Sequence, residues 1–360
     1  MRGPQLGNLG ALVVGLALLL GSAGSQAGLQ DVPQWVPEQY RSYFVHYVDD
    51  RSTVERALNL AGWTRQDTGR SFALVAGISR YPRMQGRAAT LKPAADDVAK
   101  LVAYLREYEF FNEIVVLENQ DVTLQNLQYF LTNYFPRRLR QAPKSRFLFA
   151  YSGHGMTESN RGFILTTEAT SLEDRYDAIS MAVLRGIFQD VVDTGYHVLA
   201  LINACYGGSF INMSFGERDY PPQREGAHAI TAGRSGELTW HDPEFGGGTG
   251  SLFFEAVLEG LDGRADYPPE DGLVTMKELD TYLSGTISGF TRGQQNPQSG
   301  DLRSEQSPGG FFFLDRRRQV EARITEPFEC NSGCIRAPSQ LKEQGERLRR
   351  FPTRASPKRR

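Results

Sequence analysis

The feature that most constrains the fold is a regular alternation of short apolar runs with longer amphipathic segments, which begins near Ser71. Strands that are buried on both faces of a parallel sheet read as continuous apolar runs of this length. The predicted strands are 72–78, 113–118, 146–152, 197–204, 227–232 and 311–314. The sequence therefore predicts an α/β fold built on an open, mostly parallel sheet of about six strands.

Helical periodicity fills the intervals between the strands. The predicted helices are 93–105, 123–135, 179–192, 251–261 and 275–283. Thr275 and Glu278 have the spacing of a capping box at the start of the last helix. Helices of this kind cover both faces of a parallel sheet, which gives an α/β/α sandwich. We place this domain at 71–315, after a lead-in at 28–70 that packs on it and before a C-terminal extension at 316–360.

Two strand ends carry residues with catalytic chemistry. The strand 146–152 runs into Gly153-His154-Gly155, and the strand 197–204 runs into Cys205. In open α/β sheets, functional groups gather just beyond the carboxyl ends of the strands. A thiol nucleophile needs a nearby imidazole, and small neighbours let a substrate backbone approach. We therefore predict that Cys205 and His154 face one another across a cleft.

The motifs around these residues carry a family resemblance. Y-S-G-H-G (151–155) and N-A-C-Y-G-G (203–208) each follow an apolar strand, about fifty residues apart. Further matches are A-A-D-D-V (94–98), G-T-G-S-L-F (248–253) and D-G-x-x-T-x-x-E-L (271–279). Between about residues 71 and 315, the chain resembles the caspase-like cysteine peptidases of family C14, specifically their metacaspase-type bacterial members.

The resemblance implies a role for each of the motif residues. Cys205 would attack the scissile carbonyl to form a thioester, and His154 would donate a proton to the leaving amine. The two side chains act as a dyad in this family, without an Asp or Asn that orients the imidazole. Gly155 and Cys205 would supply backbone N–H groups to the oxyanion. The expected function is that of an endopeptidase acting on a protein or peptide substrate.

The expected specificity depends on three polar residues. Strand alternation places Asn203 on the same side as Cys205, at a position where the metacaspase-type pattern has an Asp that helps to bind a basic side chain. Asp97 matches the family's acidic position near the first helix, and Glu237 follows the strand 227–232. We predict from these residues a preference for a basic residue before the cut. Asp97 has an alternative interpretation as a helix N-terminal charge that the dipole favours.

No metal or cofactor is predicted. The remaining histidines lack metal-ligand spacing; they are His46, His197, His228 and His241. Asp271, Gly272, Thr275 and Glu278 fit part of a calcium-binding loop, but its first and third positions would be Tyr267 and Pro269, which provide no carboxylate. Calcium activation is left open, and nothing in the sequence indicates a nucleic-acid partner.

The two ends of the chain differ from the domain. An apolar centre at 9–20 and the small residues 21–27 are typical of a secretory signal peptide cleaved after Ala27, with an uncleaved anchor as the alternative. The localisation predicted from it is secreted or periplasmic. From Arg336 to Arg360, nine Lys and Arg residues stand against Glu343 and Glu346, so this basic tail is either a solvated end or a contact with an anionic envelope surface.

The chain has three cysteines, an odd number that leaves at least one unpaired. Cys330 and Cys334 lie four residues apart, and in an oxidising compartment we predict that they close a disulfide, with two free thiols as the alternative. That pairing leaves Cys205 free, as a nucleophile must be.

Two further expectations concern activity. The segment 216–226 contains Pro221 and Pro222 and is expected to be an exposed loop, where self-cleavage would occur after Arg218 or Arg224. Non-catalytic use of the cleft, as a binding or scaffold protein of the cell envelope, is the alternative to peptidase activity. A third class is an envelope-associated interaction protein whose basic tail is the working part.

Overall fold

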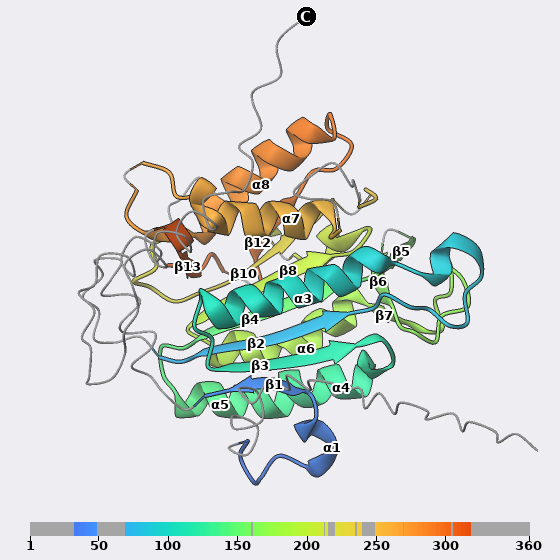
Figure 1. Cartoon of the computed structure of the whole chain (residues 1–360), viewed down its shortest axis with the longest axis horizontal. Helices are drawn as coiled ribbons and strands as arrows, with labels where there is room; N and C mark the ends of the chain where they lie inside the picture. The colour runs from blue at the N-terminus through green and yellow to red at the C-terminus, as the bar shows by residue number, and fades with distance from the viewer. Residues whose placement is uncertain are drawn as a thin grey trace, which may run out of the picture.

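The computed structural model describes residues 32–48, 69–159, 161–211, 213–214, 220–234, 236–239, 249–268, 270–303 and 305–317. The predicted signal peptide, Arg218, the Cys330–Cys334 pair and the basic tail lie outside these residues. Within them, a large central sheet lies between two layers of helices (Figure 1). The predicted α/β/α sandwich is therefore confirmed.

The sheet has eight strands in the order β1-β3-β2-β4-β8-β10-β12-β9. Five neighbouring strands are parallel, and these are five of the predicted ones. They are β2 (Ser71–Gly77), β3 (Glu113–Glu118), β4 (Arg146–Ser152), β8 (His197–Asn203) and β10 (Gly226–Thr231). The three outer strands run antiparallel to their neighbours. They are β1 (Phe44–Tyr47), β12 (Gln298–Asp301) and β9 (Met213–Ser214).

One predicted strand belongs elsewhere. The run 311–314 forms β13 (Phe312–Leu314), which pairs with β11 (Leu273–Thr275) in a separate two-stranded sheet. Its apolar residues indicated a buried strand correctly, but an apolar run does not specify a partner. A third sheet, also unpredicted, follows the carboxyl end of β4. It consists of β5 (Gly155–Glu158), β6 (Arg161–Leu165) and β7 (Ala178–Ser180).

Helices cover both faces of the central sheet and create two hydrophobic cores (Figure 1). One core contains side chains of α3 (Lys92–Glu107), α7 (Leu252–Glu259) and α8 (Met276–Phe290). The other contains those of α6 (Met181–Thr194) and of a continuous helical segment with a π-helical centre. That segment is α4 (Leu124–Gln128), η4 (Tyr129–Tyr134) and α5 (Phe135–Gln141). Strand β2 serves both cores because its side chains alternate between the two faces.

The helix boundaries follow local chemistry. Thr275 and Glu278 form the predicted capping box at the start of α8. The predicted helix 179–192 begins two residues late, at Met181, because Ala178–Ser180 pair with β6 and Ser180 caps the helix by accepting from the Val183 N–H. The predicted helix 123–135 continues to Gln141 as α5.

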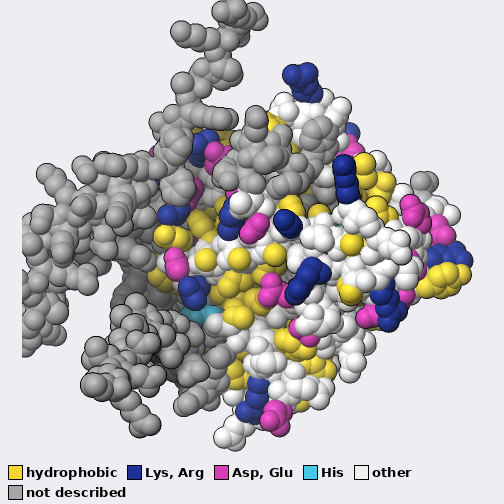
Figure 2. Space-filling view, turned by 45° about the vertical axis from the view of Figure 1, so that its right-hand side comes forward, with side chains coloured by type: hydrophobic (Ala, Val, Ile, Leu, Met, Phe, Trp, Pro, Cys, Tyr) yellow, Lys and Arg dark blue, Asp and Glu magenta, His cyan; other side chains and the backbone are white. Residues whose placement is uncertain are grey.

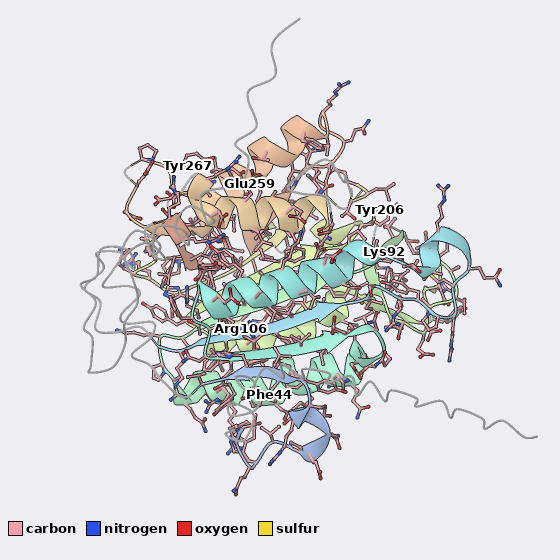
Figure 3. The ribbon with its side chains drawn as sticks, viewed as in Figure 1. Phe44, Lys92, Arg106, Tyr206, Glu259 and Tyr267 are labelled. Atoms are coloured by element: carbon pink, nitrogen blue, oxygen red, sulfur yellow. The ribbon has the colours of Figure 1, made fainter. Side chains whose placement is uncertain are left out.

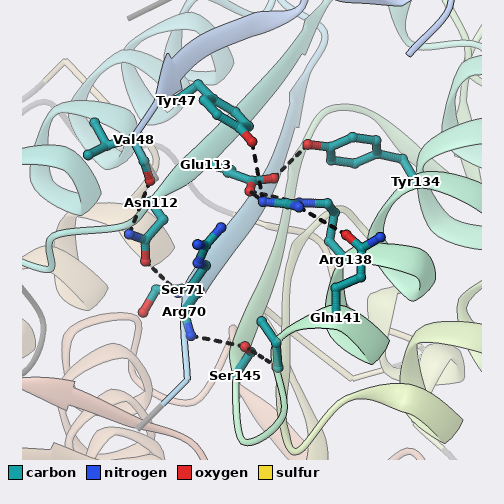
Figure 4. Close-up of polar contacts among 11 residues, drawn as sticks. Tyr47, Val48, Arg70, Ser71, Asn112, Glu113, Tyr134, Arg138, Gln141 and Ser145 are labelled. Atoms are coloured by element: carbon teal, nitrogen blue, oxygen red, sulfur yellow. Dashed lines mark hydrogen bonds and ion pairs between the residues drawn. The ribbon is translucent and has the colours of Figure 1, made fainter. Parts of the chain in front are cut away.

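The described part of the lead-in, 32–48, is integrated into the domain. Strand β1 extends the central sheet, and α1 (Glu38–Arg41) carries Tyr40, whose ring stacks on Tyr129 with 3.6 Å between centroids. Figure 4 shows the polar contact that fixes β1 to the helical layer. There Tyr134 donates to Glu113 over 2.6 Å, and Arg138 pairs with Glu113 while donating to Tyr47. Aromatic packing and this buried cluster therefore make the segment part of the fold.

On the face shown in Figure 2, Lys and Arg side chains are interspersed with Asp and Glu, around a central band of hydrophobic side chains. Among the described residues, no helix has the length and apolarity needed to cross a membrane.

Candidate active site

His154 follows the end of β4 by two residues and is half-buried. Its ring Nε2 lies 3.0 Å from the carbonyl oxygen of Ala88, in the short helix η2 (Gly86–Ala89). A carbonyl only accepts, so Nε2 carries the proton and Nδ1 keeps its lone pair. Burial lowers the pKa of His154, although the Ala88 carbonyl acts to raise it. A neutral imidazole is thus available near neutral pH, with Nδ1 as its basic nitrogen.

Tyr81 fixes the imidazole from the other side. Its ring centroid lies 4.7 Å from that of His154, and its hydroxyl accepts the His154 backbone N–H over 2.7 Å. Gly153 passes so close to this contact that a Cβ there would lie 2.3 Å from the Tyr151 hydroxyl. A glycine is therefore required at this turn by the tyrosines that support His154.

Cys205 follows β8, the strand next to β4, and is a half-buried free thiol. Gly155 packs on its backbone, since a Cβ at Gly155 would lie 2.2 Å from the Cys205 carbonyl oxygen. The residue after His154 is thus in direct contact with the turn that carries Cys205. Among the described residues, no hydrogen bond joins the thiol to the imidazole, and the Cys205 N–H has no acceptor. Catalytic hydrogen bonds often form only once substrate is bound.

Figure 3 places this turn within the domain. Tyr206, the residue after Cys205, lies at the same end of the sheet as Lys92, where α3 begins, and Arg106 lies at the opposite end of that helix. Strands β2, β4 and β8 all end on the Tyr206 side. The structure therefore brings His154, Gly155 and Cys205 together at the carboxyl edge of the parallel strands, as the sequence predicts.

Asp97 and Asn203 lie together beneath this edge. The Asp97 carboxylate accepts from the Ser152 hydroxyl over 2.6 Å and from the Asn203 amide over 3.3 Å. Its other oxygen accepts from the Ser251 N–H over 2.7 Å, at the N-cap of α7. Asp97 therefore interacts with the amino end of α7 instead of that of its own helix, which revises its alternative interpretation. Among the described residues, no Lys or Arg forms an ion pair with Asp97, and Lys100 on the same helix pairs with Glu255.

Burial dominates the electrostatics of this cluster. It raises the pKa of Asp97 to about 6, against the opposing effect of the hydrogen bonds from Ser152 and Ser251. Asn203 is 5% exposed, and its Oδ1 is buried with no hydrogen-bond partner. An unmatched buried acceptor costs free energy, and Asn203 Oδ1 is such an acceptor within an almost entirely buried cluster.

Glu237 has a different environment from the predicted one. Its carboxylate accepts from the backbone N–H groups of Arg234 and Asn296 and from the Asn296 amide, the last two over 2.7 Å. The carboxylate therefore links the loop after β10 to the segment before β12. Because these donors already occupy it, the geometry does not support binding of a basic substrate side chain.

Several site residues had no signal in the sequence. The Ala88 carbonyl is a backbone group, and Tyr81 lies in a loop without a motif. Ser152 is part of the Y-S-G-H-G motif, but its contact with Asp97 follows only from the fold. Thr239 lies against the thiol of Cys205, with Oγ1 3.6 Å from Sγ, although it belongs to none of the matching motifs.

The loop before β10 is only partly exposed. Gln223, Arg224 and Glu225 are exposed, whereas Tyr220 and Pro222 are buried. Arg224 lies two residues before Gly226, where β10 begins, and Gly226 pairs with His197, where β8 begins. Cys205 follows the other end of β8, so Arg224 and Cys205 lie at opposite ends of these strands. Its N–H is bonded in a turn to the Pro221 carbonyl. This placement does not favour cleavage of Arg224 by Cys205 of the same molecule.

Among the described residues, no three His, Cys, Asp or Glu side chains are grouped to hold a metal ion. The segment 271–278, which fits only part of a calcium-binding loop, has the structure that its sequence predicts, a turn before a capped helix. Asp271 accepts from the Leu273 N–H, and Glu278 completes the capping box.

The chain matches a known protein-family model. The model of the peptidase C14 caspase-domain family matches residues 70–304, well over half of the chain. One similar structure is caspase-1 from Spodoptera frugiperda, at 13% identity over 68% of this chain and 94% of that chain, with a TM-score of 0.45. Another is a protein of Geobacter sulfurreducens, at 13% identity over 68% of this chain and 99% of that chain, with a TM-score of 0.44. No curated protein matches the sequence. The chain belongs to the caspase-domain family of cysteine peptidases.

Proposed function

We propose that the chain is a secreted or periplasmic cysteine endopeptidase that uses Cys205 and His154. The observation that carries the proposal is the packing of Gly155 on the Cys205 backbone, which joins the histidine turn to the cysteine turn. The tautomer of His154 supports it, because Nδ1 is left to exchange protons.

The reaction proceeds in two halves. The Cys205 thiol transfers its proton to His154, and the sulfur forms a bond to the scissile carbonyl carbon. The carbon–nitrogen bond then breaks, His154 protonates the leaving amine, and a thioester remains. Water, deprotonated by His154, hydrolyses the thioester and regenerates the thiol. The Cys205 N–H, and that of Gly155, are the proposed donors to the oxyanion.

The Asp97–Asn203 cluster is the proposed selector of a basic residue before the cut. It combines one buried carboxylate with an acceptor, Asn203 Oδ1, that has no partner. A guanidinium or ammonium group can supply both the opposite charge and the missing donor. The metacaspase-type pattern has an Asp at position 203 in addition to the acidic residue matched by Asp97. This chain has Asn203 there and so has only one acidic group in the cluster. We therefore expect only a moderate preference for a basic residue before the cut.

Cleavage of a peptide library by the chain without residues 1–27 tests the function. Peptides with Arg or Lys before the cut are compared with Asp and uncharged residues, and Cys205→Ala is the control. Cleavage by the parent chain alone, after Arg or Lys, supports the proposal. Cleavage only after Asp would contradict the assignment of the Asp97–Asn203 cluster as the specificity pocket. A folded protein that cleaves no peptide would support the scaffold alternative.

The preference for a basic residue is expected to depend on pH. Because the pKa of Asp97 is raised to about 6, the carboxylate is charged above pH 6 and neutral below it. The ratio of kcat/KM for Arg over Gln before the cut should therefore rise, by about tenfold, as the pH increases from 5 to 7.5. Asp97→Asn should remove that rise, while Asp96→Asn, one residue away on α3, should leave it. An identical pH profile in Asp97→Asn and the parent would exclude Asp97 from the pocket.

A further inference from the structure

The loop between β10 and α7 lies directly against the nucleophile. The backbone N–H of Thr239 donates to Cys205 Sγ over 3.5 Å, and the Thr239 hydroxyl lies 3.6 Å from the same sulfur. Both contacts are within hydrogen-bond range for sulfur. One backbone donor and one hydroxyl, which can donate to a thiolate, therefore converge on the atom that must become the attacking anion.

The same loop also holds the turn that follows the nucleophile. The Glu237 carbonyl accepts the Tyr206 N–H over 3.0 Å. Tyr206 has φ of 64°, in the left-handed region that a residue with a side chain adopts only where its surroundings enforce it. The loop therefore contacts the cysteine turn at two points: Thr239 lies against the Cys205 sulfur, and the Glu237 carbonyl accepts the N–H of Tyr206.

Glu237 itself is anchored to a third loop. Its carboxylate accepts both donors of Asn296, which lies between α8 and β12, and the Arg234 N–H. These bonds fix the part of the loop after β10 that carries Glu237 relative to the segment before β12. The environment that argues against a substrate-binding role for Glu237 is therefore suited to holding Thr239 in place.

We infer that Thr239 stabilises the Cys205 thiolate, and that Glu237 is a positioning residue that holds Thr239 against the sulfur. The inference rests on the proposed function and names two further residues that prepare the nucleophile. Hydrogen-bond donors aimed at sulfur favour the thiolate over the thiol. Among the described residues, the buried phenol of Tyr81 interacts electrostatically with Cys205, and the His154 ring, after β4, packs on that phenol.

The pH dependence of Cys205 alkylation by iodoacetamide tests the inference without any peptide. The rate is followed by mass spectrometry of the Cys205 peptide, which separates it from Cys330 and Cys334. Thr239→Val removes the hydroxyl and keeps the backbone N–H, so the midpoint of the rate–pH curve should move up by about one pH unit. Thr239→Ser keeps the hydroxyl and should restore the parent curve. Thr132→Val, a helical threonine bonded to the Gln128 carbonyl, is the matched control.

Glu237→Ala removes three hydrogen bonds from the loop, and its midpoint should rise at least as far as that of Thr239→Val. Superimposable curves for the parent and Thr239→Val would overturn the role of Thr239, and an unchanged curve in Glu237→Ala would overturn that of Glu237. The readout also separates the two proposals. If the curve of Thr239→Val shifts but the parent cleaves no peptide, Thr239 stabilises the thiolate and the proposed peptidase function is wrong. If the parent cleaves peptides but the curve of Thr239→Val does not shift, the peptidase function stands and the role of Thr239 is wrong.

Discussion

Cys205→Ala is expected to reduce kcat/KM for a cleaved peptide to the uncatalysed background, a loss on the order of 10⁵-fold or more. Alanine cannot form the thioester, so no covalent route remains. His154→Ala should cost about 10²- to 10⁴-fold, because proton transfer is lost while the thiol survives. Initial rates at several pH values measure both effects.

The double variant distinguishes a dyad from two independent residues. Groups that act in one step do not contribute additively, so the double variant should be no slower than Cys205→Ala alone. His46→Ala provides the matched control, since His46 lies on β1, remote from the site, and its loss should change kcat/KM less than twofold. Full activity in His154→Ala would contradict the assignment of the histidine.

The predictable parts of the fold are those in which a local sequence pattern is compatible with only one kind of secondary structure. The five parallel strands are apolar on both faces, and buried strands of this kind need no knowledge of their partners to be recognised. Strand β12 could not be found this way, because Gln298–Asp301 is polar in sequence although Ser299, Gly300 and Asp301 are buried. Its position depends on pairing with β10 and on hydrogen bonds such as that from the Ser307 N–H to Asp301.

The site divides in the same way. The positions of His154 and Cys205 at strand ends were predictable because each follows a buried strand within a glycine-containing motif. Their supports were not, because they act through backbone groups or come from loops without periodicity: the Ala88 carbonyl, Tyr81 and Thr239. Glu237 illustrates the limit most clearly, since its type and position in the chain suggested a substrate contact, while Asn296, which determines its role, lies about sixty residues away in the sequence.

Arg146→Met is expected to produce a large loss of stability although it lies outside the site. Arg146, 3% exposed, pairs with fully buried Glu109 over 3.0 Å. It also donates to the Glu109 and Phe312 carbonyls and to the Ser71 hydroxyl, and Glu109 accepts the Leu314 N–H. The pair thus joins the amino ends of β2 and β4 to β13. Removing the cation leaves a buried carboxylate, which costs about 3–5 kcal/mol in the free energy of unfolding.

Urea unfolding of three variants separates this loss from the loss of packing. Arg146→Met combined with Glu109→Gln should recover a large part of the stability, because no unpaired charge remains. Arg106→Met breaks the exposed pair with Glu107 and should cost less than about 1 kcal/mol. Equal losses in the single and double variants would mean that Arg146 contributes through packing on its aromatic neighbours and not through its charge.

The pH dependence of that loss gives an independent test with a defined sign. In the parent chain, burial raises the pKa of Glu109, and Arg146 opposes that rise. Without Arg146, only the Leu314 N–H bond still opposes burial, so the pKa of Glu109 rises further. Folded Arg146→Met then binds a proton that its unfolded chain releases at lower pH. Its stability should then fall as the pH increases above the unfolded value of about 4.3. The difference in unfolding free energy between parent and variant should consequently be larger at pH 8 than at pH 5, and a difference independent of pH would exclude an unpaired Glu109 charge as its cause.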